Sequence, residues 1–172
     1  HHYATDVIFR IGTLNDSTFH ARIFGEQTYH LVASPAYIST HGKLQVPADL
    51  THHKCLVYKG STGPNRWLFK TGNEDWTPFL APALLMSNNA ESLLVSALKG
   101  MGIVLFPDWL IGEYLKSGEL IKLLPNYSTA VKTTPQHVAA LYPHTRHISL
   151  NVRTLIDYFA KVYGTPIYWQ LN

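Results

Sequence analysis

The sequence has only one cysteine, Cys55, among its 172 residues. A single cysteine cannot form a disulfide within the chain, so a fold held together by disulfides is excluded and a reducing compartment fits. No segment approaches the roughly 18 consecutive apolar residues that span a membrane, and the first residues do not follow the pattern of a secretion signal. From these absences we expect a soluble, cytoplasmic protein.

Charge is also sparse, and no stretch of the chain carries a block of one sign. Only 15% of the residues are charged, and 14 lysines and arginines against 11 aspartates and glutamates give a net charge of +3. The basic residues are scattered, so we do not expect a nucleic-acid-binding surface within this chain. Apolar residues make up 46% of the sequence, which is enough to bury a core in one domain or in two small ones.

Catalytic and metal-binding patterns are missing as well. The sequence contains no G-x-S-x-G elbow for a nucleophilic serine. Glu74-Asp75 adjoins a turn-forming TGN segment, which is typical of a solvated loop and not of an acid–base pair. The pairs His52-His53 and His144-x-x-His147 lack the further Cys, Asp or Glu residues that would complete a zinc site. We therefore expect no enzyme, no cofactor and no metal ion.

Cys55 itself lies in an apolar segment, where a cysteine usually packs as a small hydrophobic side chain. Its neighbours Lys54 and His53 would lower the pKa of the thiol if it were exposed. A redox-sensing role for Cys55 therefore stays open beside the structural one.

What the sequence does contain is a strong strand–helix–strand pattern. Asn88 followed three residues later by Glu91 is typical of a helix N-cap with its reciprocal partner, and the apolar residues that follow recur at helical spacing. Short apolar runs at 83–86 and 103–106 flank this helix as predicted strands. Such units are nearly always parallel and right-handed, so both strands end at the same sheet edge. The side chains expected there are Asn88, Asn89, Phe106 and Pro107.

This predicted edge has the properties of a ligand site. Ligands of open α/β sheets bind beyond the carboxyl ends of strands, where a helix N-terminus also offers unpaired N–H groups. The Ser87-Asn88-Asn89 turn lacks the glycine of a phosphate loop, so a carboxylate or a polar neutral ligand fits it better than a nucleotide. The alternative is that both asparagines only cap the helix.

The remaining pattern indicates an α/β fold. Strands are predicted at 6–11, 55–58, 67–69 and 138–142, a long or bent extended segment at 21–33, and helices at 108–116, with Asp108 as its cap, and at 150–163. The first strand and the last helix have little predicted structure to pack against. We expect part of their unit to be missing or to come from another chain.

Several segments together resemble the effector-binding domain of LysR-type transcriptional regulators. They cover nearly the whole chain in the order of the family. They are DVIFRIGTLNDSTFHARIFGEQTYHLVASPAYISTHG, VPADLTHHKCLVY, NNAESLLVSALKGMGIVLFP, SGELIKLLPNY and LYPHTRHISLNVRTLIDYFAKVYG.

The resemblance implies a two-lobed, periplasmic-binding-protein-like α/β fold, in which two crossing segments join Rossmann-like lobes. Residues 1–33 and 137–172 would belong to the first lobe, which is incomplete, and residues 34–136 would form the second. The segments HLVASP (30–35) and HVAALYP (137–143) would be the crossing connections, which makes them hinge candidates.

The resemblance also implies a role in transcription regulation. In the family, a winged helix-turn-helix and a linker helix precede this domain, and a small effector bound between the lobes controls DNA binding. Here DNA would be contacted only through that absent N-terminal domain, in a full-length homodimer or homotetramer. A small, anionic effector is expected in the cleft at Thr13, Ser34, Asn88, Asn89, Phe106 and Pro107.

Two alternatives remain at this point. The hydroxyls of Thr13 and Ser34 are also typical of loop side chains that bond only to the backbone. A solute-binding protein that serves transport shares the lobed fold, and it would carry a secretion signal where a regulator carries a helix-turn-helix.

Overall fold

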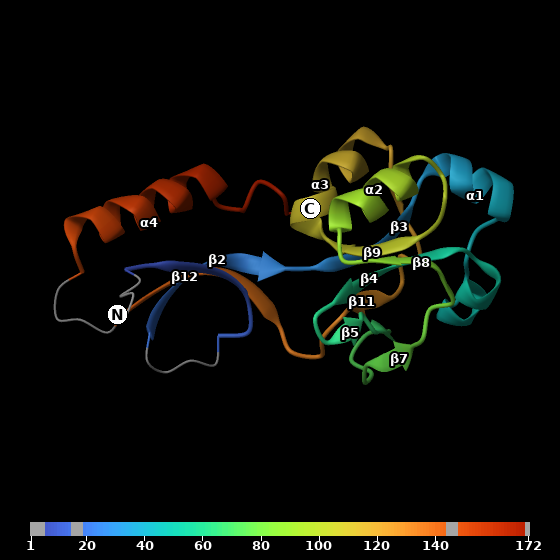
Figure 1. Cartoon of the computed structure of the whole chain (residues 1–172), viewed down its shortest axis with the longest axis horizontal. Coiled ribbons are helices and arrows are strands. Elements are labelled where there is room, and N and C mark those ends of the chain that lie inside the picture. The colour runs from blue at the N-terminus through green and yellow to red at the C-terminus, as the bar shows by residue number, and fades with distance from the viewer. Residues whose placement is uncertain (1–5, 15–18, 144–147, 171–172) are drawn as a thin grey trace. The chain divides into compact units, whose positions relative to one another are not determined.

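The computed structural model describes residues 6–14, 19–143 and 148–170. The chain forms two compact units (Figure 1), of which unit 1 contains residues 6–27 and 134–170 and unit 2 contains residues 28–133. The chain passes from unit 1 to unit 2 after residue 27 and returns after residue 133. The segments expected to cross between lobes, 30–35 and 137–143, begin just after these points. The assignment of the two units to lobes of a larger domain stays a prediction.

Unit 1 is a three-stranded antiparallel sheet with one helix. Its strands are β1 (Ile8–Gly12), β2 (Phe19–Gln27) and β12 (Gln136–Pro143), with β12 in the middle. The helix α4 (Leu150–Tyr163) packs one face on β12 through Val152 and Ile156, which follow each other at helical spacing. The helix predicted at 150–163 and the strand predicted at 138–142 are confirmed.

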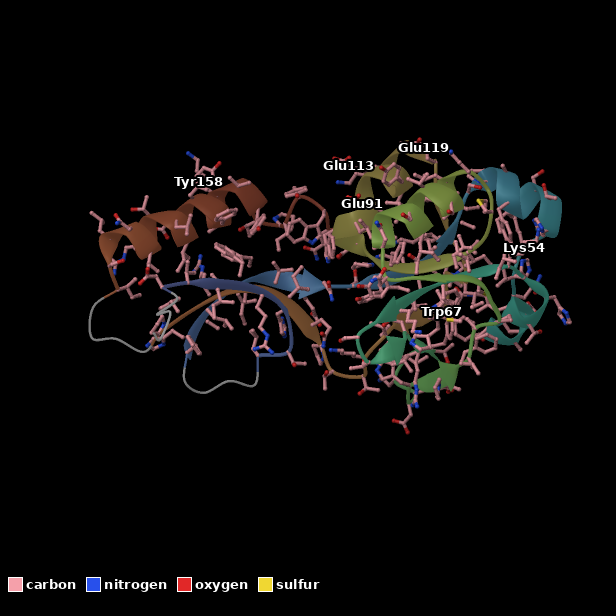
Figure 2. The ribbon with its side chains drawn as sticks, in the orientation of Figure 1. Lys54, Trp67, Glu91, Glu113, Glu119 and Tyr158 are labelled. Atoms are coloured by element: carbon pink, nitrogen blue, oxygen red, sulfur yellow. The ribbon has the colours of Figure 1, made fainter. Side chains whose placement is uncertain are left out.

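The first strand and the last helix pack on each other, yet both keep apolar surface. The rings of Phe9 and Phe159 lie with their centroids 4.6 Å apart. Ile11 on β1 is nevertheless 50% exposed and Tyr158 on α4 is 60% exposed. Figure 2 shows Tyr158 on the side of α4 that faces away from the strands of unit 1. The apolar side chains that lack packing partners in β1 and α4 are therefore those that do not face each other.

Unit 2 is built on strands that pair in one continuous series. The edge strand β8 (Ala83–Ser87) pairs parallel with β4 (Cys55–Gly60). A parallel bridge between Cys55 and Ile103 joins β4 to the start of β9 (Val104–Pro107), and β9 pairs antiparallel with β3 (Tyr29–Ala33). Shorter strands complete the unit: β5 (Gly63–Pro64), β6 (Trp67–Lys70), β7 (Thr77–Phe79), β10 (Ile121–Lys122) and β11 (Ser128–Ala130).

Successive side chains of β3, β4 and β9 point to opposite faces of the sheet, so unit 2 has a hydrophobic core on each face. Val32, Leu56 and Val104 face the helices α2 (Ala90–Leu98) and α3 (Asp108–Ser117), which Figure 1 shows together on one side of β4, β8 and β9. The opposite core includes Trp67 (Figure 2) and is closed by α1 (Pro35–His41) and the short 3-10 helix η1 (Pro47–His52). Within the described residues, no helix is both long and apolar enough to cross a membrane.

The predicted strand–helix–strand unit is confirmed, but its cap lies one residue later than expected. The elements β8, α2 and β9 follow in order. The N-cap of α2 is Asn89, whose Oδ1 accepts the N–H of Ser92 at 3.0 Å, so the prediction of Asn88 is wrong. The Ser87 hydroxyl accepts the N–H of Asn89 at 3.0 Å, and this turn delays the first helical residue to Ala90.

Gly102 permits the close approach of β9 to β4. A Cβ atom at Gly102 would lie 2.5 Å from the carbonyl oxygen of Lys54 and 3.0 Å from Cγ of Leu56. We expect Gly102→Ala to lower the free energy of unfolding by about 1 to 3 kcal/mol, the usual cost of overpacking. Urea unfolding beside Gly60→Ala tests this, because a Cβ at Gly60 meets only Tyr58, at 3.6 Å. Equal stability of the two variants would show that β9 does not need a glycine at position 102 to approach β4.

Candidate functional site

The carboxyl ends of β8 and β9 lie at the same edge of unit 2, because both strands run parallel to β4. The helix α2 begins shortly after β8 ends, and α3 begins directly after β9. Two helix N-termini therefore open at this edge, where they meet the four residues that the sequence pattern placed there. We call residues 87–91 and 106–109 the carboxyl edge.

At α2, the two asparagines have different roles. Asn89 caps the helix with its Oδ1 atom, which leaves its Nδ2 group for another partner. Asn88 is exposed and takes no part in the cap. The first turn of α2 also carries Glu91, which Figure 2 labels and whose charge favours a helix N-terminus. This end of α2 therefore offers amide groups and a partial positive charge to a small polar ligand.

At α3, the protein itself occupies the helix N-terminus with a buried carboxylate. Asp108 is only 1% exposed, and its Oδ1 accepts the N–H of Trp109 at 2.9 Å. Its Oδ2 accepts the hydroxyl of Thr28 at 2.9 Å and the N–H of Thr28 at 3.3 Å, while the Asp108 N–H donates to the Thr28 carbonyl at 2.8 Å. Asp108 is the first residue of α3 and Pro107 is its N-cap, so the prediction that Asp108 caps this helix is wrong.

Burial shifts the pKa values of two groups at or near this edge, the Asp108 carboxyl and the His30 ring. Burial raises the pKa of the Asp108 carboxyl above its ordinary value, while the hydrogen bonds from Thr28 and Trp109 act in the opposite direction. Burial and the nearby charge of Lys122 lower the pKa of His30, which pairs with Phe106 across the strands, to about 4. His30 is therefore neutral at physiological pH. The carboxyl edge itself contains no Lys or Arg.

The other predicted site residues are placed less favourably for ligand contact. Phe106 is 4% exposed and packs in the core under α2 and α3, and Pro107 is buried beside it. Ser34 follows the far end of β3, roughly 16 Å of extended chain from Tyr29, which pairs with Pro107. Thr13 follows β1 in unit 1, and its part in a common site stays a prediction.

Ser34 has a structural role of its own. Its buried hydroxyl accepts the N–H of Tyr37 at 3.2 Å and so caps α1. This matches the alternative in which the hydroxyl bonds only to the backbone. The structure brings Asn88, Asn89, Phe106 and Pro107 to one edge and does not bring Ser34 to it.

Sequence reasoning missed Thr28 at this site. Thr28 is the first residue of unit 2 and lies 80 positions from its partner Asp108. An acidic residue directly after the proline that ends a strand was a signal for Asp108, but we read it as a local helix cap. No local pattern marks Thr28, because its partner is fixed only by the pairing of β3 with β9.

Cys55 is fully buried in β4. Burial raises the pKa of its thiol to about 12, whereas redox and metal chemistry need the thiolate. The structure therefore gives no support to the redox role and agrees with a packing role. Across the described parts of the chain, no three His, Cys, Asp or Glu residues come together as a metal site requires. His144 and His147 lie outside the described residues.

The hydroxyl of Thr28 is expected to stabilise unit 2 through the buried carboxylate of Asp108. Replacing Thr28 by Val keeps the shape of the side chain. It removes the hydrogen bond to the Asp108 carboxylate and the 3.3 Å contact with Nε2 of His30, so we expect a loss of about 1.5 to 3 kcal/mol in the free energy of unfolding. Thr28→Ser, which keeps the hydroxyl, is the matched control in urea unfolding at pH 7. If Thr28→Val and Thr28→Ser unfold at the same urea concentration, this hydrogen bond does not stabilise the fold.

Cys55 is expected to be unreactive in the folded chain. At pH 8 a thiol whose pKa is about 12 is almost entirely protonated, and its burial blocks access of a reagent. Absorbance of a chromogenic disulfide reagent should show almost no labelling of the folded chain and complete labelling in urea. Labelling of the folded chain at the rate of the unfolded chain would restore the redox role.

Comparison with protein families gives a match over nearly the whole chain. The family described as the LysR substrate binding domain matches residues 1–164. An uncharacterized HTH-type transcriptional regulator of Haemophilus influenzae is 35% identical over 86% of this chain and 49% of its own length. The HTH-type transcriptional regulator CrgA of Neisseria meningitidis serogroup B is 30% identical over 94% of this chain and 52% of its own length. The chain thus spans about half the length of these curated relatives.

Solved structures agree with the sequence comparison. The regulatory domain of AphB from Vibrio vulnificus matches with a TM-score of 0.75 and 30% identity, over 92% of this chain and 75% of that domain. The structure of CrgA from Neisseria meningitidis matches with a TM-score of 0.75 and 26% identity, over 91% of this chain and 52% of that protein.

Proposed function

The chain belongs to the LysR substrate-binding domain family, and we propose that it is the effector-sensing part of a longer transcriptional regulator. The family match over residues 1–164 carries this proposal. The relatives CrgA and AaeR are named as HTH-type transcriptional regulators, which favours sensing over solute transport. The intact gene product distinguishes the two, because a regulator carries a helix-turn-helix before this domain and a transport protein carries a secretion signal.

We place the effector at the carboxyl edge of unit 2. The donors available there are the Nδ2 group of Asn89, the side chain of Asn88 and the first turn of α2. Phe106 and Pro107 support this edge from the core, and Thr13 remains our proposed contribution from unit 1. We leave Ser34 out of the site because its hydroxyl already caps α1.

The chemistry of the edge defines the ligand class. Helix N–H groups and side-chain amides suit a carboxylate or a neutral polar group. The edge contains no Lys or Arg, and Glu91 adds a negative charge to it. The ligand that fits is therefore a small monocarboxylate or a neutral polar metabolite, and a polyanion such as a nucleotide does not fit.

Sensing requires no chemical change of the effector. A ligand that binds one arrangement of the domain more tightly than another shifts the equilibrium between them by the difference in its two binding free energies. In the longer protein this shift would reach DNA through the helix-turn-helix parts of a homodimer or homotetramer in the cytoplasm. No catalytic residue is needed for this function, and we propose that the chain is not an enzyme.

A thermal-shift screen tests the effector site. The purified chain is heated with small carboxylates, aromatic acids and neutral metabolites. A ligand at about 100 times its Kd adds roughly 2.7 kcal/mol to the free energy of unfolding, which for a chain of this size raises Tm by about 5 to 10 °C. We expect such a rise with at least one compound of these classes.

Asn89→Ser is the variant that separates ligand binding from helix capping. Serine is also a favoured N-cap, so the basal Tm should change little, but the Nδ2 group is lost. The ligand-induced rise should fall by at least half in Asn89→Ser. An unchanged rise in this variant would show that the effector binds elsewhere.

A further inference from the structure

A second polar cluster of unit 2 lies at the far end of β3 from the carboxyl edge. It is centred on Tyr37 of α1, which is only 1% exposed. The Tyr37 ring stacks on the His41 ring with centroids 4.2 Å apart and an angle of 10° between the planes. Its hydroxyl reaches the segment before β4, where His53 and Lys54 lie. Figure 2 labels Lys54 at this end of β4.

The hydrogen bonds of the Tyr37 hydroxyl favour one protonation state of the His53 ring. The Tyr37 oxygen accepts the N–H of Lys54 at 2.8 Å and lies 3.0 Å from Nδ1 of His53. A backbone N–H can only donate, so the hydroxyl proton needs an acceptor of its own. Among the described residues, His53 Nδ1 is the acceptor that the structure provides. This arrangement favours a neutral His53 with its proton on Nε2, the tautomer in which Nδ1 can accept.

Protonation of His53 is incompatible with this arrangement. A charged His53 ring carries a proton on Nδ1, so two donors would point at the Tyr37 oxygen and the hydroxyl proton would lose its acceptor. Because Tyr37 is only 1% exposed, loss of this acceptor would leave a buried hydroxyl proton unsatisfied, which costs free energy. We propose that Tyr37 and His53 form a proton-operated latch, which holds α1 on the start of β4 at neutral pH and releases it in mild acid.

The charged groups around His53 come from three elements. His41 faces it from α1, Asp49 and His52 from η1, and Lys54 and Cys55 adjoin it at β4. Burial lowers the pKa of His53 below its ordinary value of 6.5, the charge of His41 lowers it further, and Asp49 acts in the opposite direction. Burial raises the pKa of the Tyr37 hydroxyl, which therefore stays a donor at neutral pH.

The direction of the pH effect follows from these shifts. Below pH 6.5 the unfolded or released segment binds a proton at His53 that the latched state does not bind. The latch is thus fully formed above pH 6.5 and is lost as the pH falls through the lower pKa of the folded state. This device is separate from the proposed effector site and does not depend on it.

Tyr37 also takes part in the N-terminal cap of α1. Ser34 caps α1 through the N–H of Tyr37, and Gly42 closes the helix through its N–H bond to the Ile38 carbonyl at 2.8 Å. Opening of the latch should therefore be seen first in the backbone amides of residues 38–42. Because His30 also titrates below its ordinary pKa, a measurement local to α1 is needed.

Hydrogen–deuterium exchange of the full 172-residue chain tests the latch. Protection of the amides at 38–42 is measured at pH 7.5 and pH 5.5 and corrected for intrinsic exchange rates. We expect the protection of residues 38–42 to be lower at pH 5.5 than at pH 7.5, while the amides of α2 change much less. Equal protection of α1 at the two pH values would overturn the proposal.

Variants assign the effect to His53. His53→Asn keeps an acceptor near the position of Nδ1 and cannot be protonated, so α1 should lose its pH response. The neighbouring His52 is exposed, and His52→Asn should keep the response of the wild type. A pH response that persists in His53→Asn would overturn the latch.

An NMR titration keeps the proposal testable if His53→Asn fails to fold. The His53 ring of the wild type should titrate below pH 6.5. In Tyr37→Phe, which lacks the hydroxyl, its pKa should rise toward 6.5. A His53 ring that titrates at or above 6.5 in the wild type, or that does not respond to Tyr37→Phe, would overturn the latch.

Discussion

The parallel pairing of β4 with β8 on one side and with Ile103 on the other is the constraint on which unit 2 depends. It makes both strands of the β8–α2–β9 unit end at the same edge. It requires a close approach at Gly102, where a Cβ atom would meet the Lys54 carbonyl. It also buries Cys55 between the two pairings, and this burial raises the pKa of the thiol. The candidate site exists because this pairing brings the N-termini of α2 and α3 together.

The two helix N-termini at this edge are not equivalent. At α3, the buried Asp108 carboxylate accepts the N–H of Trp109 and ties the helix to Thr28, the first residue of unit 2. The protein thus supplies its own anion to α3. At α2, Asn89 caps the helix with one atom and keeps its Nδ2 group. The N-terminus of α2 is therefore the helix end that is open to a ligand. The hydrogen bond between Asp108 and Thr28 connects the site to the residue at which the chain enters unit 2.

The elements could be predicted from the sequence because their signals are local. Apolar spacing located the helix at 150–163 to the residue. The strands β8 and β9 were predicted from the apolar runs that flank α2, and α2 from its own apolar spacing and an asparagine cap. The cap of α2 was misplaced by one residue because the Ser87 hydroxyl decides it, and Asp108 was misread because its partner Thr28 is distant in sequence. Ser34 was assigned to the site on its position in the chain, yet the direction of β3 takes it to the other end of the strand. Periodicity fixes which residues are helical or extended, but it does not encode these side-chain hydrogen bonds.

The central claim is that a small effector binds at the N-terminus of α2. The most direct test is a two-dimensional amide NMR spectrum of the isotope-labelled chain, recorded while the compound that raises Tm is added. We predict that the amide signals of residues 87–91, 108 and 109 shift most, and that those around Ser34 and Tyr37 at the far end of β3 stay in place. Shifts concentrated around Ser34 and Tyr37, with residues 87–91 unchanged, would contradict the account.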